Sequence, residues 1–228
     1  MNNQGILLVN KSRGSTSFQI VHQLRKLTKI EKIGHAGTLD PFAVGVMVLL
    51  VGRDFTRKSD EFLSADKEYR ATLHLGVSTD SYDIDGQVTD RSEIVPDLNQ
   101  VHLAIASFQG KILQVPPMFS AKKIQGKKLC DLARKGIVVE RAAVPVEIQI
   151  KLIRYEYPEL EIEASCSKGT YIRSLAFDIG QLLGCGAHLS SLIRLRSGAF
   201  TLEECIPQEL LKNPEFDIRP HLRLGSYV

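Results

Sequence analysis

One carboxylate in this chain stands in a setting that suits chemistry. Asp40 comes near the end of the run Gly34-His35-Ala36-Gly37-Thr38-Leu39-Asp40-Pro41, just after a predicted helix. Because Pro41 disfavours helical geometry in the residue before it, we expect an extended or turn conformation at Asp40. A carboxylate fixed on such a turn can be presented to a ligand. An ordinary turn is the alternative interpretation, since Asp and Gly are common turn formers.

Four further motifs accompany this turn. They are Lys67-Glu68-Tyr69-Arg70, Gly126-Lys127-Lys128-Leu129, Ser167-Lys168-Gly169-Thr170-Tyr171-Ile172-Arg173 and Gly184-Cys185-Gly186-Ala187-His188-Leu189. With the Asp40 turn, the set resembles the bacterial tRNA pseudouridine synthase B family in order and spacing, from about Gly5 to about Phe200. The resemblance implies a pseudouridine-synthase fold and isomerisation of uridine to pseudouridine at position 55 in the T-loop of tRNA. That reaction requires no cofactor and no metal.

The resemblance implies three catalytic roles. Asp40 matches the catalytic aspartate, which acts as a nucleophile or as a base on the ribose. Arg173 would keep that carboxylate ionised, since an opposite charge favours the ionised form; a surface arginine in a salt bridge is the alternative. Tyr69 matches the aromatic residue on which the flipped-out uracil stacks. A half-buried core tyrosine is the alternative there.

Five more residues are expected to bind substrate. His35 is expected on an exposed turn, where the family pattern has its ring fill the gap left by the flipped base; otherwise it is a turn histidine. Tyr171 and Leu192 correspond to residues that line the uracil pocket. Lys11 matches the family's early lysine and would meet a phosphate or brace the pocket. Asp83 is expected to brace Arg173 from behind.

Lysine and arginine residues are concentrated in one segment of the chain. Between residues 122 and 141 lie Lys122, Lys123, Lys127, Lys128, Arg134, Lys135 and Arg141. Phosphate contacts supply much of the affinity in nucleic-acid binding. We therefore expect a mobile, basic RNA-binding excursion at about 118–145, with Lys122, Lys123, Lys127 and Lys128 contacting phosphates. A solvated surface helix is the alternative interpretation.

The composition describes an ordinary globular protein. Hydrophobic residues make up 43% of the 228 residues and charged residues 24%, while 29 Lys and Arg against 26 Asp and Glu give a net charge of +3. That excess is too small to indicate nucleic acid by itself. The four cysteines are scattered, and the longest apolar run is too short for a membrane span. From the first residues we expect no signal peptide. We expect a cytoplasmic monomer with no membrane contact and no obligate protein partner.

The elements that must position these residues follow from hydrophobic periodicity. Strands are predicted at about 5–10, 69–77, 144–155, 159–166 and 190–200. Helices are predicted at 172–183 and 203–211, and over a segment with apolar positions Phe18, Val21, Leu24, Leu27 and Ile30. The opposite face of that segment, with His22, Arg25, Lys26 and Lys29, is either solvated or turned to RNA. The mixture indicates an α+β fold whose central sheet is mixed but mainly antiparallel, flanked by helices and loops.

Two departures from the family pattern stand out. Asn10-Lys11-Ser12-Arg13-Gly14 replaces the usual Asp-Lys-Pro-x-Gly, which predicts a looser turn. The chain is expected to be a single catalytic domain over 1–228, without the C-terminal PUA domain that many members carry, and hence to bind tRNA more weakly. The alternatives are a synthase for a different RNA, or a non-catalytic RNA-binding or RNA-folding module. A glycoside hydrolase ranks last, because it usually needs two flanking carboxylates.

Overall fold

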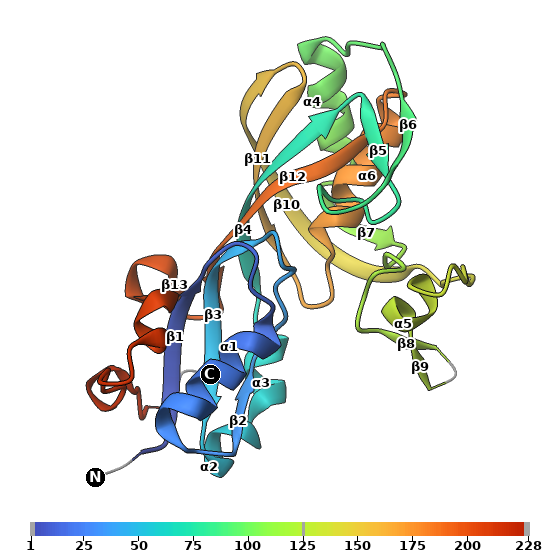
Figure 1. The fold of residues 1–228 in the computed structure, drawn as a ribbon. Coiled ribbons are helices and arrows are strands. Elements are labelled where there is room, and N and C mark those ends of the chain that lie inside the picture. Colours follow the sequence, from blue (N-terminus) through green and yellow to red (C-terminus); the bar gives the residue numbers. More distant parts are fainter. Residues whose placement is uncertain (1–2, 125, 226–228) are drawn as a thin grey trace. The chain divides into compact units, whose positions relative to one another are not determined.

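The fold comes from a computed structural model that describes residues 3–124 and 126–225 (Figure 1). Its contacts divide the chain into two compact units. Unit 1 comprises Met1–Tyr69 and Leu192–Val228, and unit 2 comprises Arg70–Ser191. The chain passes from one unit to the other within two strands, β4 (Lys67–Leu75) and β12 (Ala187–Ser197).

The sheet of unit 1 is built around a long antiparallel pair. Strand β1 (Gly5–Lys11) pairs with β3 (Val44–Val51), so that Lys11 lies opposite Gly45. The short strand β2 (Ile33–His35) pairs antiparallel with β3, and β12 pairs parallel with β3 at Ile193 and Val44. The apolar run that the sequence shows before Gly52 is thus the central strand β3. It begins at Val44, shortly after the segment that carries Asp40.

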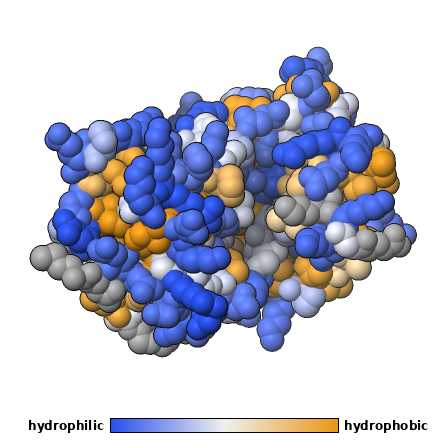
Figure 2. All heavy atoms as spheres, turned by 60° about the horizontal axis from the view of Figure 1, so that its bottom comes forward, coloured by the Kyte–Doolittle hydropathy of each residue, from blue (hydrophilic) through white to orange (hydrophobic). Residues whose placement is uncertain are grey.

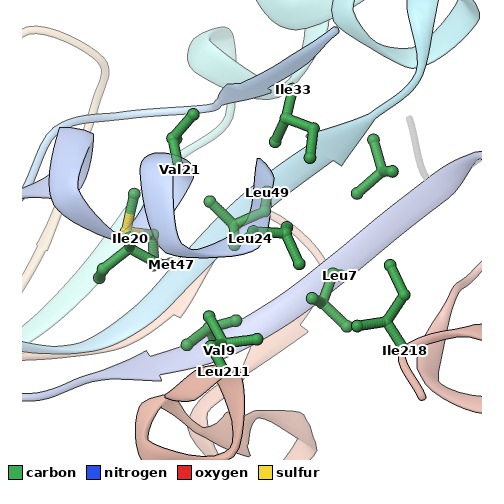
Figure 3. Packing of buried hydrophobic residues seen from close by; sticks show 11 residues of the cluster. Leu7, Val9, Ile20, Val21, Leu24, Ile33, Met47, Leu49, Leu211 and Ile218 are labelled. Carbon is green, nitrogen blue, oxygen red and sulfur yellow. The ribbon is translucent and has the colours of Figure 1, made fainter. Parts of the chain in front are cut away.

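Helix α1 (Ser17–Thr28) packs on this sheet (Figure 3). Thr16 caps it: its hydroxyl accepts from the N–H of Gln19 (3.1 Å), and the Gln19 side chain accepts from the N–H of Thr16 (2.7 Å). The residues that it buries are Ser17, Ile20, Val21 and Leu24. Phe18, one of the apolar positions spaced by three in the sequence, is exposed, because the buried face follows the helical period of 3.6.

The C-terminal part of unit 1 differs from the prediction. The helix predicted at 203–211 is wrong: two 3-10 helices, Leu202–Glu204 and Gln208–Lys212, flank the short strand β14 (Ile206–Pro207), which pairs parallel with β1. Pro207 has no N–H to give to a helix, which explains the interruption. The remaining elements of unit 1 are α2 (Arg53–Thr56), α3 (Ser59–Ser64), β13 (Phe200–Thr201) and the 3-10 helix Arg219–His221.

Unit 2 is organised on strands in the order β4, β11 (Glu159–Cys166), β10 (Val144–Glu156) and β7 (Gly110–Gln114). Both predicted strands of the β10–β11 pair are confirmed, as is the helix α6 (Ile172–Leu182). The strand predicted at 69–77 ends at Leu75, because Gly76 takes a positive φ of 85°. The other elements are β5 (Val77–Thr79), β6 (Val88–Arg91), α4 (Leu98–Ser107), β8 (Lys123–Ile124), β9 (Lys127–Lys128) and α5 (Leu129–Ala133).

The predicted fold class is confirmed. The strand pairs are mostly antiparallel, with parallel exceptions at β1–β14 and β3–β12. Hydrophilic side chains cover most of the face in Figure 2, and smaller hydrophobic patches lie between them. Among the described residues, no helix is long and apolar enough to cross a membrane.

Candidate active site

A buried lysine holds the segment that follows Asp40. The side chain of Lys11, at the end of β1, is fully buried. Its ammonium donates to the carbonyl oxygens of Ala43 (2.6 Å) and Pro41 (3.0 Å), and to its neighbour Ser12 (3.2 Å). A fully buried ammonium with these partners fits the bracing role predicted for Lys11 and not a contact with phosphate.

A second buried cation holds the segment that precedes Asp40. Arg194, on β12, is only 1% exposed. Its guanidinium donates to the carbonyl oxygens of Val46 (2.7 Å) and Gly37 (3.2 Å). Gly37 has a φ of 108°, and a Cβ there would lie 3.3 Å from the guanidinium. Sequence reasoning missed Arg194, although strand alternation places it on the same face as the buried Leu192.

Further hydrogen bonds tie the Asp40 turn to helix α1. The buried hydroxyl of Ser17 donates to the carbonyl of Leu39 (3.2 Å) and accepts from its N–H (3.0 Å). The carbonyl of Asp40 accepts from the N–H of Ala43 (3.1 Å), which closes a turn over Pro41. Asp40 itself is half-buried. The turn predicted from Asp-Pro is therefore present, and contacts on both sides fix its backbone.

The sequence predicted His35 on an exposed turn, and this prediction is wrong. It is the last residue of β2, opposite Leu49, and it is half-buried because this strand pairs along β3. Burial, and then the positive charge of Arg194, lower the pKa of His35 below its usual value. Its Nδ1 is buried without a hydrogen-bond partner among the described residues. Both effects favour the neutral form of the ring.

Tyr69 and Leu192 belong to the same unit as Asp40. Tyr69 is half-buried on β4, and Leu192 on β12 is 5% exposed. Unit 1 thus holds Lys11, His35, Asp40, Tyr69 and Leu192, while Asp83, Tyr171, Arg173 and the basic segment belong to unit 2.

Arg173 is a buried residue in the first turn of α6, so the surface-arginine alternative is wrong. It is 4% exposed. Its Nη1 lies 3.3 Å from Oδ2 of Asp83 and donates to the carbonyl of Ser81 (3.1 Å), and its Nη2 donates to the carbonyl of Phe119 (2.7 Å). The predicted contact between Asp83 and Arg173 is therefore present in unit 2.

The loop that carries Asp83 is itself fixed. The Oδ1 of Asp83 accepts from the hydroxyl of Ser81 (2.6 Å) and from the N–H of Asp85 (3.1 Å). The loop is also bonded to β12, since the N–H of Ile84 donates to the carbonyl of Leu189 (3.0 Å). A buried ion pair needs such additional partners to offset the loss of solvation. The orientation of the guanidinium is thereby set from within unit 2.

A buried glutamine fixes the entry to α6. Gln114, at the end of β7, is 1% exposed. Its amide oxygen accepts from the N–H of Tyr171 (2.8 Å), and its amide nitrogen donates to the carbonyl of Tyr171 (3.1 Å). Ser174 adds a hydrogen bond to the carbonyl of Val115 (2.8 Å). Sequence reasoning missed Gln114 and Ser174, because nothing in a local pattern marks pairings across 57 and 59 positions.

The basic segment forms a small hairpin followed by the short helix α5. Lys123 lies opposite Lys128, and Ile124 lies opposite Lys127. Lys123 and Lys127 are exposed and Lys122 is half-buried; the side chain of Lys128 is outside the described part. A hollow of about 410 Å³ is lined by Lys123, Gly126, Lys127, Asp131, Leu132 and Lys135. Three lysines thus face one hollow, a setting suited to an anion.

These arrangements define the chemistry available. A carboxylate stands on a fixed turn in unit 1, and an oriented, buried guanidinium starts a helix in unit 2. Across 3–124 and 126–225, no three His, Cys, Asp or Glu side chains are grouped to hold a metal ion.

Comparisons with known proteins agree on one family. Residues 25–172 match the model of the TruB family pseudouridylate synthase N-terminal domain, and residues 173–216 match the tRNA pseudouridylate synthase B C-terminal domain. A tRNA pseudouridine synthase B of Chlamydia pneumoniae is 58% identical over 220 residues, which cover 96% of this chain and 94% of that protein. One of Protochlamydia amoebophila is 63% identical over 203 residues, covering 89% and 78%.

Solved structures agree on the fold. A chain of a Cbf5-Nop10-Gar1 complex is similar with a TM-score of 0.71 and 30% identity over 92% of this chain. An H/ACA RNP bound to a substrate RNA containing 2'-deoxyuridine gives a TM-score of 0.66 and 28% identity over 91%. This chain spans 54% and 52% of those two chains. The predicted pseudouridine-synthase fold is confirmed.

Proposed function

Because the chain belongs to the TruB family of pseudouridylate synthases, we propose that it isomerises the uridine at position 55, in the T-loop of tRNA. The family establishes the enzyme class: this is a pseudouridine synthase, an isomerase that converts uridine to pseudouridine in tRNA. The observation that carries the choice of catalytic residue is the fixed turn at Asp40, held by two buried cations.

The reaction is balanced without any co-reactant. The bond between uracil N1 and ribose C1′ breaks, and a bond between uracil C5 and C1′ forms. The proton on C5 leaves and N1 gains a proton, so no electron donor or group donor is required. The enzyme must expose the base, place a carboxylate beside the sugar, and keep that carboxylate ionised.

We assign the carboxylate to Asp40 and the cation that keeps it ionised to Arg173. An opposite charge close to a carboxylate favours its ionised form. The bonds from Arg173 to Asp83, Ser81 and Phe119 support this role, because a guanidinium that is already oriented loses little freedom when a ligand binds.

We assign the uracil pocket to Tyr69, Tyr171 and Leu192. A base flipped out of its stack loses a few kcal/mol, and stacking on an aromatic ring returns about 1–3 kcal/mol. His35 would fill the gap left in the RNA. The lowered pKa of His35 supports this, since a neutral ring enters stacked bases without bringing a charge.

The basic segment at about 118–145 would bind the T-arm of the tRNA. Lys122, Lys123, Lys127 and Lys128 are the proposed phosphate contacts, and the hollow between Lys123 and Lys127 supports the placement of one phosphate there. The proposal is for a monomeric cytoplasmic enzyme, with one catalytic domain and no obligate protein partner.

Position 55 is tested by mapping pseudouridine on two unmodified RNAs, a full tRNA transcript and its isolated T-arm hairpin. We expect one pseudouridine in each, at the same T-loop uridine, and none when that uridine is replaced by cytidine. Modification at any other tRNA position would contradict the proposed site. If tRNA is bound but not modified, the remaining hypotheses are a synthase for a different RNA and a non-catalytic RNA-binding module.

A further inference from the structure

Helix α1 exposes an aromatic ring. Phe18 is 66% exposed, although the opposite face of the same helix buries Ile20, Val21 and Leu24 in the core of unit 1 (Figure 3). Single apolar side chains are common on protein surfaces, so exposure alone indicates nothing. The position of this ring and the charge around it are what carry an inference.

Phe18 adjoins a residue that is bonded to the Asp40 turn. Its neighbour Ser17 is bonded in both directions to Leu39, the residue before Asp40. On a helix, residues seven apart lie within about 20° of each other, so Phe18 shares a side of α1 with Arg25. The guanidinium of Arg25 donates to the carbonyl of Ile33 (2.8 Å), on the strand β2 that ends at His35. Phe18 is thus aligned along α1 with a residue that reaches β2.

The surface around the ring is basic. Between Asn10 and Ile30 the sequence contains five Lys and Arg residues and no Asp or Glu. Of these cations, Arg13, Lys26 and Lys29 are exposed, as is His22. Phe18, His22 and Lys26 are four residues apart and so form one stripe on the helix. An aromatic ring followed by basic groups fits a nucleic acid, whose bases stack and whose phosphates pair with cations.

We propose that this stripe is a second RNA-binding surface, on which Phe18 stacks on an unpaired base of the tRNA next to the flipped uridine. Lys26, with Arg13 and Lys29, holds the adjoining phosphates. The inference rests on the proposed function, because it takes tRNA as the ligand. Phe18 is a positioning residue: it holds the RNA in place and does not touch the reacting atoms.

The test measures binding of an unmodified tRNA transcript and the kinetics of its modification. Loss of one stacked base should weaken binding by Phe18→Ala about 5- to 150-fold. The KM should rise in the same proportion while kcat at saturating tRNA stays unchanged. Phe18→Tyr should restore binding to within about twofold, because it keeps the ring. The matched control is Leu224→Ala, since Leu224 is another exposed apolar side chain of unit 1, 57% exposed.

Salt dependence separates the ring from the cations. Lys26→Ala should lower the slope of log Kd against log salt by about 0.7 to 0.9, and Phe18→Ala should leave that slope unchanged. If Phe18→Ala binds tRNA as tightly as Leu224→Ala does, the inference is wrong. It is also wrong if Phe18→Ala alters self-association but not tRNA affinity. If the wild type binds tRNA without modifying it, the proposed function fails, and the inference is decided by the binding data alone.

Discussion

At the scale of single residues, three buried cations fix the local backbone, two of them in unit 1 and one in unit 2. Lys11, Arg173 and Arg194 are each 4% exposed or less, and all three donate to backbone carbonyls. A buried charge is costly unless hydrogen bonds compensate it. Such a residue therefore stabilises one backbone conformation strongly, because any other conformation leaves the charge without its partners.

Arg194 supplies the sharpest test of this view. Arg194→Met should remove the donors to the buried carbonyl of Val46 and the part-buried carbonyl of Gly37, and lower the free energy of unfolding by about 2–5 kcal/mol. Because a displacement of about 1 Å near reacting groups costs about 100-fold in rate, kcat should fall at least tenfold. Urea unfolding and single-turnover kinetics measure the two effects.

The matched control is Arg196→Met on the same strand. Arg196 pairs with Glu68 (2.7 Å), and the two side chains are 30% and 40% exposed. A surface ion pair of this kind contributes about 0–1 kcal/mol. If the two variants lose stability and activity to the same extent, the hydrogen bonds from Arg194 to the backbone do not position the Asp40 turn.

A carboxyl group on α6 makes stability depend on pH. Burial raises the pKa of Asp178 to about 6. Since the unfolded chain loses this proton at a lower pH than the folded chain, Asp178 lowers stability progressively from about pH 4 to about pH 6, and by a constant amount above that. Partial exposure limits the effect to the order of 1 kcal/mol.

The variant Asp178→Asn removes this penalty. We expect it to be more stable than the wild type at pH 8 and equally stable at pH 4, as measured by urea unfolding at both values. Asp90→Asn, on the exposed strand β6, should show no such difference. A stability gain of Asp178→Asn that is the same at both pH values would refute the assignment of the effect to titration.

At the scale of elements, the sequence predicted what local periodicity encodes. The alternation in β10 and β11 and the apolar face of α6 were read correctly. The segment around Pro207 was not, because the pairing of β14 with β1 outweighs a helical pattern. A spacing of three includes Phe18 among the apolar positions of α1 and omits Ile20, whereas the helix buries Ile20 and leaves Phe18 exposed.

The basic segment is expected to act through charge alone. Replacing Lys123, Lys127 and Lys135 by Ala should weaken tRNA binding and lower the salt slope by about 2 to 3, because each cation that neutralises a phosphate contributes about 0.7 to 0.9. At saturating tRNA, kcat should not change. Lys151→Ala, on an exposed position of β10, is the control, and its salt slope should stay within one phosphate contact of the wild type. An unchanged salt slope in the triple variant would exclude these lysines as phosphate contacts.

At the scale of the whole molecule, contacts across long sequence distances explain what could not be predicted. Arg173 donates to Ser81 and Phe119, which are 92 and 54 positions away. The motif resemblance pointed to Arg173 and Lys11, because those residues stand in recognisable runs, and Asp83 was expected beside Arg173. It could not find Gln114, Ser17 or Arg194, whose roles depend on which strand or loop the fold brings beside them.

The central claim is that Asp40 performs the chemistry on a tRNA uridine held by the rest of the chain. The most direct measurement is the yield of pseudouridine in an unmodified tRNA transcript under single-turnover conditions, with tRNA affinity measured in parallel. For Asp40→Asn we predict no product and unchanged affinity, and for Asp60→Asn, an exposed acid of unit 1, wild-type values of both. Product from Asp40→Asn at a rate near that of the wild type would contradict the account.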